Sequence, residues 1–346
     1  MISNSTSVVK VIKSLPEKYK PYFVAFIIFL FNTFLHFFIR TNSSTEYQIG
    51  YLYYSQIISL TISFASILVV VLIGWRYISS FSALTAGIIL SLFPIFFSLP
   101  SLINPESTYL LFYTSAIYFY LRFLEFEHKK KPIMPSILLG CAIYINFSGV
   151  SLYFLLVILT FVWSKGFRKI TNYILIYRIV FIFLIAISFY FFLSLLPALN
   201  SIPAAAASMV SSSRILLSLI ISKSTSLIGF NGISSLISII ALTPNLILVL
   251  LFYGVRHMLK QKSWILSSVV IWLIVPIVFT LFYSSRTGSA TQVELLAPLS
   301  LISAFGLEKL SRRVSTSNQV EPLILFAVIV YLLVVNFINE PINKFI

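Results

Sequence analysis

The feature that most constrains this chain is the recurrence of long apolar runs along its length. A run of about 20 predominantly apolar residues crosses the hydrocarbon core of a bilayer as a helix. Hydrophobic residues make up 59% of the 346 residues, and charged residues make up 10%. A soluble domain usually has about a quarter of its residues charged. The sequence therefore predicts an all-α, polytopic helical membrane protein.

The apolar runs predict about eleven transmembrane helices. We expect them at residues 21–39, 57–75, 82–99, 107–124, 133–147, 149–163, 173–196, 232–255, 264–283, 292–310 and 321–339. The fifth and sixth are short, and Phe147-Ser148-Gly149 separates them, so half-helices that turn inside the membrane are an alternative to two full spans. The expected organisation is a cytoplasmic segment at 1–20 and a single transmembrane domain at 21–346. Its sizeable outer loops are 40–56 and 197–231.

Lys and Arg distinguish the two sides of this bundle. With the N-terminus in the cytoplasm, 19 of the 24 basic residues face inward, Arg178 among them. The five that face outward are Arg40, Arg214, Lys223, Arg286 and Lys344. Such an excess indicates the cytoplasmic side. The sequence therefore predicts a multi-pass protein with a cytoplasmic N-terminus, in either the plasma membrane or the endoplasmic reticulum.

The composition excludes several kinds of site. The net charge of +15 comes from residues at the ends of apolar runs, so we expect no nucleic-acid partner. The chain has no Asp, which excludes a Ser-His-Asp triad. Its three His are isolated and Cys141 is its one cysteine, so no metal motif is evident and no disulfide can form within the chain. We predict no cofactor and leave a need for a divalent metal open.

Acids at the outer ends of the helices are the first candidate site residues. Glu46, Glu106 and Glu294 each lie where an outer loop meets a helix, a position at which ionisable groups often serve a pathway or a site. For Glu106 helix capping is an equal alternative, because Asn104 and Pro105 precede it. Glu308, on the inner side, is interpreted as a solvated loop charge.

Outer cations form the second group of candidates. Asn32, His36 and Arg40 are spaced four residues apart, which places them in one polar stripe on the first helix. Arg286 follows the ninth helix, and an arginine fork suits a phosphate group. We expect Arg286, with Lys223 or Arg214, to hold an anionic head group. Solvation or snorkelling of these cations is the alternative.

Several short motifs occur in a recognisable order. They are Thr45-Glu46-Tyr47, Asn104-Pro105-Glu106 running to Phe112, Leu138 to Tyr144 with Ser148-Gly149 beyond, Arg286, and Leu295 to Leu299. In this order the chain resembles the C-type (GT-C) integral-membrane glycosyltransferases, such as protein mannosyltransferases and lipid A aminoarabinose transferases. The resemblance covers roughly residues 20–313.

The resemblance implies a fold and a reaction. It implies a GT-C-like helical bundle that moves a sugar from a polyprenyl- or dolichyl-phosphate carrier to an acceptor on the outer face. By resemblance Glu46 is the general base, Glu106 matches the second outer acid, and Arg286 matches the residue that contacts the carrier phosphate. The chain departs from the family pattern at Thr45, where an Asp is usual, and near Asn146, where an Arg or Lys is common.

Two alternatives stay open, and the departures at Thr45 and Asn146 favour the first of them. One is a catalytically silent relative that acts as a partner or scaffold for another membrane protein. The other is a secondary transporter, for which the short fifth and sixth helices are the single hint, because no second pair mirrors them.

Overall fold

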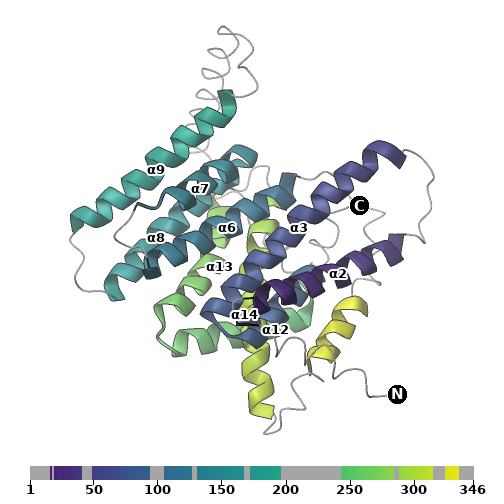
Figure 1. The fold of residues 1–346 in the computed structure, drawn as a ribbon. Coiled ribbons are helices and arrows are strands. Elements are labelled where there is room, and N and C mark those ends of the chain that lie inside the picture. Colours follow the sequence, from purple (N-terminus) through teal and green to yellow (C-terminus); the bar gives the residue numbers. More distant parts are fainter. Residues whose placement is uncertain are drawn as a thin grey trace, which may run out of the picture. The chain divides into compact units, whose positions relative to one another are not determined.

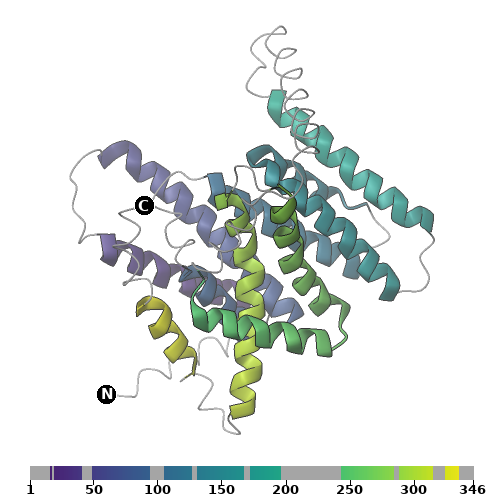
Figure 2. The same cartoon turned by 180° about the vertical axis from the view of Figure 1, so that it is seen from behind.

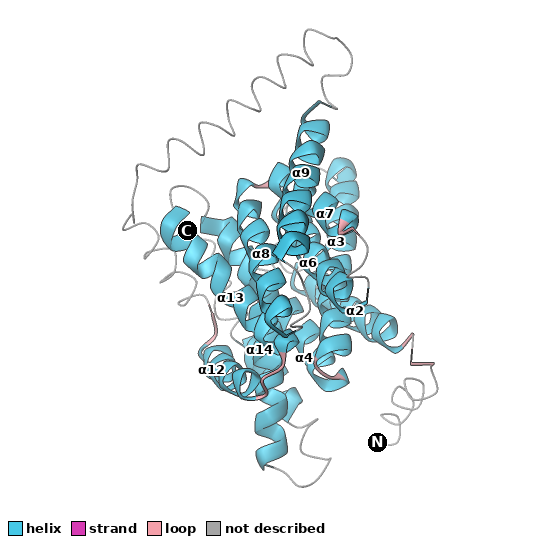
Figure 3. Ribbon diagram, turned by 90° about the vertical axis from the view of Figure 1, so that its left-hand side faces the viewer, coloured by secondary structure: helices cyan, strands magenta, loops and turns pink. Residues whose placement is uncertain are grey.

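The computed structural model describes residues 16–17, 19–40, 49–93, 105–126, 131–166, 172–195, 243–283, 288–314 and 324–334. All regular structure in these residues is helical, with no strand among them (Figure 3). This confirms the predicted all-α class. Each of the eleven expected runs overlaps a helix of the described part of the chain.

The number of membrane spans stays a prediction. By length and composition, two described helical segments could cross a membrane, Leu60–Tyr77 and Ile176–Ser194. Six further apolar helices are shorter: Lys20–Phe31, Ser80–Ser91, Ile133–Ile145, Val150–Ser164, Trp264–Phe279 and Ile324–Val334. The orientation of the N-terminus and the predicted domain boundaries are likewise still predictions.

The chain divides into two compact units. The first comprises residues 1–104, 244–257 and 299–346, and the second comprises residues 105–243 and 258–298. Two helices contribute to both units: α12 (Asn245–Lys260) and α14 (Gly288–Val314). Figure 2 shows α14 as one continuous helix.

In the first unit, three helices pack on one another: α2 (Lys20–Arg40), α3 (Ile49–Tyr77) and α4 (Ser80–Ser91). Ser79 begins α4 as its N-cap, where its hydroxyl accepts a hydrogen bond of 3.0 Å from the Ser82 amide. A side chain on Gly74 would meet the backbone of Ala83 at 2.8 Å. Glycine at this position therefore allows the start of α4 to lie directly against the end of α3.

In the second unit, α6 (Pro105–Phe126), α7 (Ile133–Ile145), α8 (Val150–Gly166), α9 (Asn172–Leu195) and α13 (Trp264–Tyr283) pack together. Of these, α9 lies alongside α7, and α13 packs on α8 (Figure 1). The 3-10 turn η2 (Phe147–Gly149) joins α7 to α8. The short fifth and sixth runs are thus two helices joined by a tight turn.

Asn146 and Gly149 build this turn. Asn146 ends α7, and its side-chain oxygen accepts a hydrogen bond of 3.0 Å from the Ser148 amide. A side chain on Gly149 would meet the backbone of Ile143 and Ala142 at 2.8 and 2.9 Å. The residue at 146, which departs from the family pattern, therefore shapes the turn that carries Ser148.

Candidate functional site

A buried carboxylate lies in the second unit. Glu294, in the second turn of α14, is 1% exposed. Its Oε1 accepts a hydrogen bond of 2.5 Å from the Tyr109 hydroxyl, and its Oε2 accepts one of 3.0 Å from Ser151 Oγ. Both carboxylate oxygens are therefore satisfied, as a buried charge-bearing group requires.

The donors come from different helices. Tyr109 is in α6, and Ser151 is in the first turn of α8. Ser148, from the turn η2, donates to the Tyr109 hydroxyl at 3.0 Å. The result is a continuous chain of hydrogen bonds from Ser148 through Tyr109 to Glu294, with Ser151 on the other oxygen. We call these four residues the Glu294 network.

The residues of the Glu294 network are buried. Tyr109 and Ser151 are fully buried, and Ser148 is 2% exposed. The Tyr109 ring packs against that of Tyr113, with centroids 5.7 Å apart. No Lys or Arg in the described part of the chain forms an ion pair with Glu294. Neutral hydroxyls alone therefore hold its carboxyl group among the described residues.

Pro298 lies four residues after Glu294 inside α14. Proline has no N–H, so the carbonyl of Glu294 lacks the donor that a regular helix would supply. The helix backbone is therefore weakened at the same turn that carries the buried carboxylate. The hydrogen bonds from Tyr109 and Ser151 connect this turn of α14 to α6 and α8.

Glu106 lies one turn before Tyr109. Helix α6 begins at Pro105 and has Glu106 in its first turn, as predicted for a residue that complements the helix dipole. Its side chain is partly exposed, whereas Tyr109 is fully buried. Residues three apart share one helix face. Glu106 is therefore carried by a turn that the Glu294 network anchors.

The structure describes the other predicted site residues less fully. Arg40 and His36 are both in α2, and the polar stripe that their spacing predicts stays a prediction. Glu46, Arg214, Lys223 and Arg286 lie outside the described residues. The structure thus brings Glu106 and Glu294 into one unit and leaves the convergence of the cations a prediction.

Tyr109, Ser148 and Ser151 were not predicted as site residues. A signal was present, because Tyr109 and Ser148 are within the motifs that carry the family resemblance. Hydroxyl groups in an apolar run need a partner when they are buried. Sequence alone does not show that their partner is Glu294, which is 185 residues beyond Tyr109.

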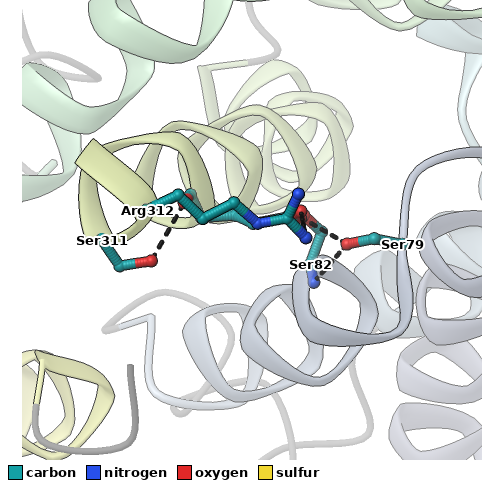
Figure 4. Close-up of polar contacts among 5 residues, drawn as sticks. Ser79, Ser82, Ser311 and Arg312 are labelled. Carbon is teal, nitrogen blue, oxygen red and sulfur yellow. Dashed lines mark hydrogen bonds and ion pairs between the residues drawn. The ribbon is translucent and has the colours of Figure 1, made fainter. Parts of the chain in front are cut away.

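A second buried carboxylate corrects the expectation for Glu308. This residue is 2% exposed rather than solvated. Its carboxylate accepts hydrogen bonds from Ser79 Oγ and, at 2.5 Å, from Ser82 Oγ, and it pairs with Arg312 Nη2 at 2.7 Å. The labelled side chains of Ser79, Ser82 and Arg312 point toward one another (Figure 4). The start of α4 and the end of α14 thus meet at Glu308, within the first unit.

Metal ligands do not gather in the described residues. No group of three or more His, Cys or Glu side chains lies close enough together there to hold an ion. The two buried acids of the described units are instead bound by hydroxyl groups.

The family comparison matches part of the chain. The sequence model of the dolichyl-phosphate-mannose-protein mannosyltransferase family matches residues 49–191. This stretch begins three residues after Glu46 and includes Glu106 and Tyr109. The predicted resemblance to the C-type glycosyltransferases is confirmed by this match. Among curated proteins, none matches the chain.

Two solved structures resemble this chain. One is the apo oligosaccharyltransferase of Archaeoglobus fulgidus, at 13% identity and a TM-score of 0.51, over 82% of this chain and 44% of that one. The other is the archaeal oligosaccharyltransferase of the same organism in complex with an inhibitory peptide and a dolichol-phosphate, at 12% identity and a TM-score of 0.49, with the same coverage. The chain therefore spans less than half the length of these proteins, and the first likeness supports a common fold.

Proposed function

We propose that this chain is an integral-membrane glycosyltransferase that moves a sugar from a polyprenyl- or dolichyl-phosphate carrier to an acceptor on the outer face. The observation that carries the proposal is the match of residues 49–191 to the dolichyl-phosphate-mannose-protein mannosyltransferases, a family named for a dolichyl-phosphate-linked sugar. The all-helical fold and its likeness to an oligosaccharyltransferase support the same class.

The reaction defines what the site must supply. The acceptor hydroxyl attacks the anomeric carbon, the bond from that carbon to the phosphate oxygen breaks, and the carrier leaves as its phosphate. A base must take the proton of the hydroxyl, and cations must stabilise the charge on the departing phosphate. The bilayer supplies the apolar environment for the carrier tail.

The proposed roles follow from the resemblance and the chemistry. Glu46 is the general base, because no other acid is in the first outer loop and the chain has no Asp. Glu106, at the start of α6, orients the acceptor. The proposed phosphate-binding cations are Arg286, Arg40, Lys223 and Arg214, with His36 as a further donor.

The test is removal of the base. Glu46→Gln keeps size and hydrogen bonding but accepts no proton, so transfer should fall by roughly 10² to 10⁴. The control is Glu125→Gln, because Glu125 is exposed near the end of α6, at the opposite end from Glu106. Transfer is measured from a lipid-phosphate-linked sugar in membranes of a host that lacks the native activity.

Two outcomes contradict the proposal in different ways. Full transfer by Glu46→Gln removes Glu46 as the base but leaves the function intact. No transfer by the unaltered protein with any polyprenyl-phosphate sugar favours the catalytically silent relative, for which the Thr45 departure is the sequence argument.

A further inference from the structure

Glu294 has almost no exposed surface with which to meet a substrate. It is 1% exposed, and both of its oxygens accept hydrogen bonds from hydroxyls that are themselves buried. A buried group of this kind affects a reaction through the residues to which it is hydrogen-bonded. One of these partners must therefore be close to a residue that contacts the substrate.

Tyr109 provides that link. Its hydroxyl donates to Glu294 at 2.5 Å and accepts from Ser148 at 3.0 Å, so the tyrosine is fixed from both sides. Its ring is fixed further by Tyr113, one turn along α6. Glu106 is one turn in the other direction, at the partly exposed start of the same helix.

We infer that Glu294 is a positioning residue, which holds the first turn of α6, and with it the Glu106 carboxylate, through the hydrogen bond to Tyr109. The expected effect on the rate of sugar transfer rests on the proposed function. The expected effect on the order of the first turn of α6 rests on the contacts alone. Misplacing a reacting group by about 1 Å can reduce a rate on the order of 10²-fold.

A carboxylate suits this position better than an amide. Both partners of Glu294 donate O–H groups, and a carboxylate accepts at both oxygens. The amide of Gln presents N–H groups to one of the two donors, so one hydrogen bond must be lost or rearranged. Glu294→Gln therefore loosens the network while it preserves the volume of the side chain.

The same helix offers a matched control. Glu308 is also buried in α14 and also accepts hydrogen bonds from two hydroxyls, but both go to Oε2 and come from Ser79 and Ser82 at the start of α4, while Oε1 pairs with Arg312. Glu308→Gln should therefore perturb a buried carboxylate of the same helix whose hydrogen-bond donors, Ser79 and Ser82, belong to the first unit and not to α6. A loss of stability should occur in both variants, whereas a displacement of Glu106 should occur only in Glu294→Gln.

The kinetic experiment compares Glu294→Gln, Tyr109→Phe, the double variant and Glu308→Gln, per amount of folded protein. We expect kcat to fall about tenfold or more in both single variants, with little change in KM for the donor. The double variant should be no slower than the slower single one, because both act through one hydrogen bond. Glu308→Gln should keep the unaltered kcat. Losses that multiply in the double variant, or equal losses in Glu294→Gln and Glu308→Gln, overturn the inference.

A spectroscopic experiment does not depend on transfer. In a Cys141→Ser background, a nitroxide spin label at Glu106→Cys reports the order of the first turn of α6 in the full-length protein. Glu294→Gln and Tyr109→Phe should each increase the mobility of the label, and Glu308→Gln should not. An unchanged spectrum in Glu294→Gln overturns the inference even if transfer falls. If the unaltered protein transfers no sugar, the proposed function fails, and the label still decides the positioning role.

Discussion

At the scale of single residues, two buried acids in one helix are held in different ways. Glu294 is bound by hydroxyls alone among the described residues, whereas Glu308 is bound by two serines and Arg312. The Arg312 side chain is 57% exposed and that of Glu308 is 3% exposed, so solvent weakens this ion pair from the arginine side. The serine donors, which are buried or partly buried, are the stronger reason for the position of Glu308.

The serine contacts of Glu308 lead to a stability prediction. Glu308→Ala leaves the hydroxyls of Ser79 and Ser82 without their acceptor, which should cost roughly 1–3 kcal/mol of unfolding free energy. Glu308→Gln keeps one acceptor and should cost less. The measurement is the unfolding transition in detergent, with exposed Glu125→Ala as the control, expected within about 0.5 kcal/mol of the unaltered protein. Equal stability of Glu308→Ala and Glu125→Ala would rule out a structural role for the serines.

Arg178 is a buried cation in the second unit. It is 6% exposed in α9, and its guanidinium lies 5.4 Å from the centroid of the Phe123 ring and 5.2 Å from that of Trp163. These distances are within the range of cation–π attraction. Arg178 therefore connects α9 to α6 and α8. The sequence analysis had placed it only among the basic residues that face inward and did not indicate this role.

At the scale of helices, glycine determines how closely two of them approach. A side chain on Gly254 of α12 would meet the carbonyl of Ile302, and one on Gly306 of α14 would meet the carbonyl of Leu250. The contact is reciprocal, and Ser303 adds a hydrogen bond of 3.3 Å to the Ile247 carbonyl. Small residues at such a crossing let two helix backbones touch.

Whether Gly306→Ala raises or lowers the stability of the protein tests this contact between α12 and α14. Helix propensity alone predicts that alanine stabilises by about 1 kcal/mol. Overpacking against a backbone carbonyl, which has no rotamer with which to move away, should instead destabilise by roughly 1–3 kcal/mol. We expect a lower unfolding temperature in detergent for Gly306→Ala, and little change for Val249→Ala on the exposed side of α12. A higher unfolding temperature for Gly306→Ala would show that the helices are not in contact there.

At the scale of the whole molecule, the distribution of charge predicts which side each loop faces. Nineteen basic residues are predicted to face inward and five outward. The site proposed above requires Glu46 on the outer side, so the proposal depends on this orientation.

Thiol labelling tests the orientation. With Cys141 replaced by serine, a single cysteine at Ser44 should react with an impermeant reagent on intact cells, and one at Lys130 should react only after the cells are opened. The opposite pattern would invert the topology and remove Glu46 from the outer face.

The sequence by itself determined the helical class and the places of the helices, because apolar runs and residues such as Pro105 act locally. It did not determine every limit, since α3 begins at Ile49 rather than 57 and α12 begins at Asn245 rather than 232. The family resemblance also came from local motifs, and the match to residues 49–191 confirms it. Tertiary structure decided which acids are buried. Glu294 and Glu308 depend on donors 143 to 229 residues away along the chain, so no local pattern showed that either carboxylate is buried. Tertiary structure also decided the close approach at Gly254 and Gly306, because the sequence does not show which helix packs against a given glycine.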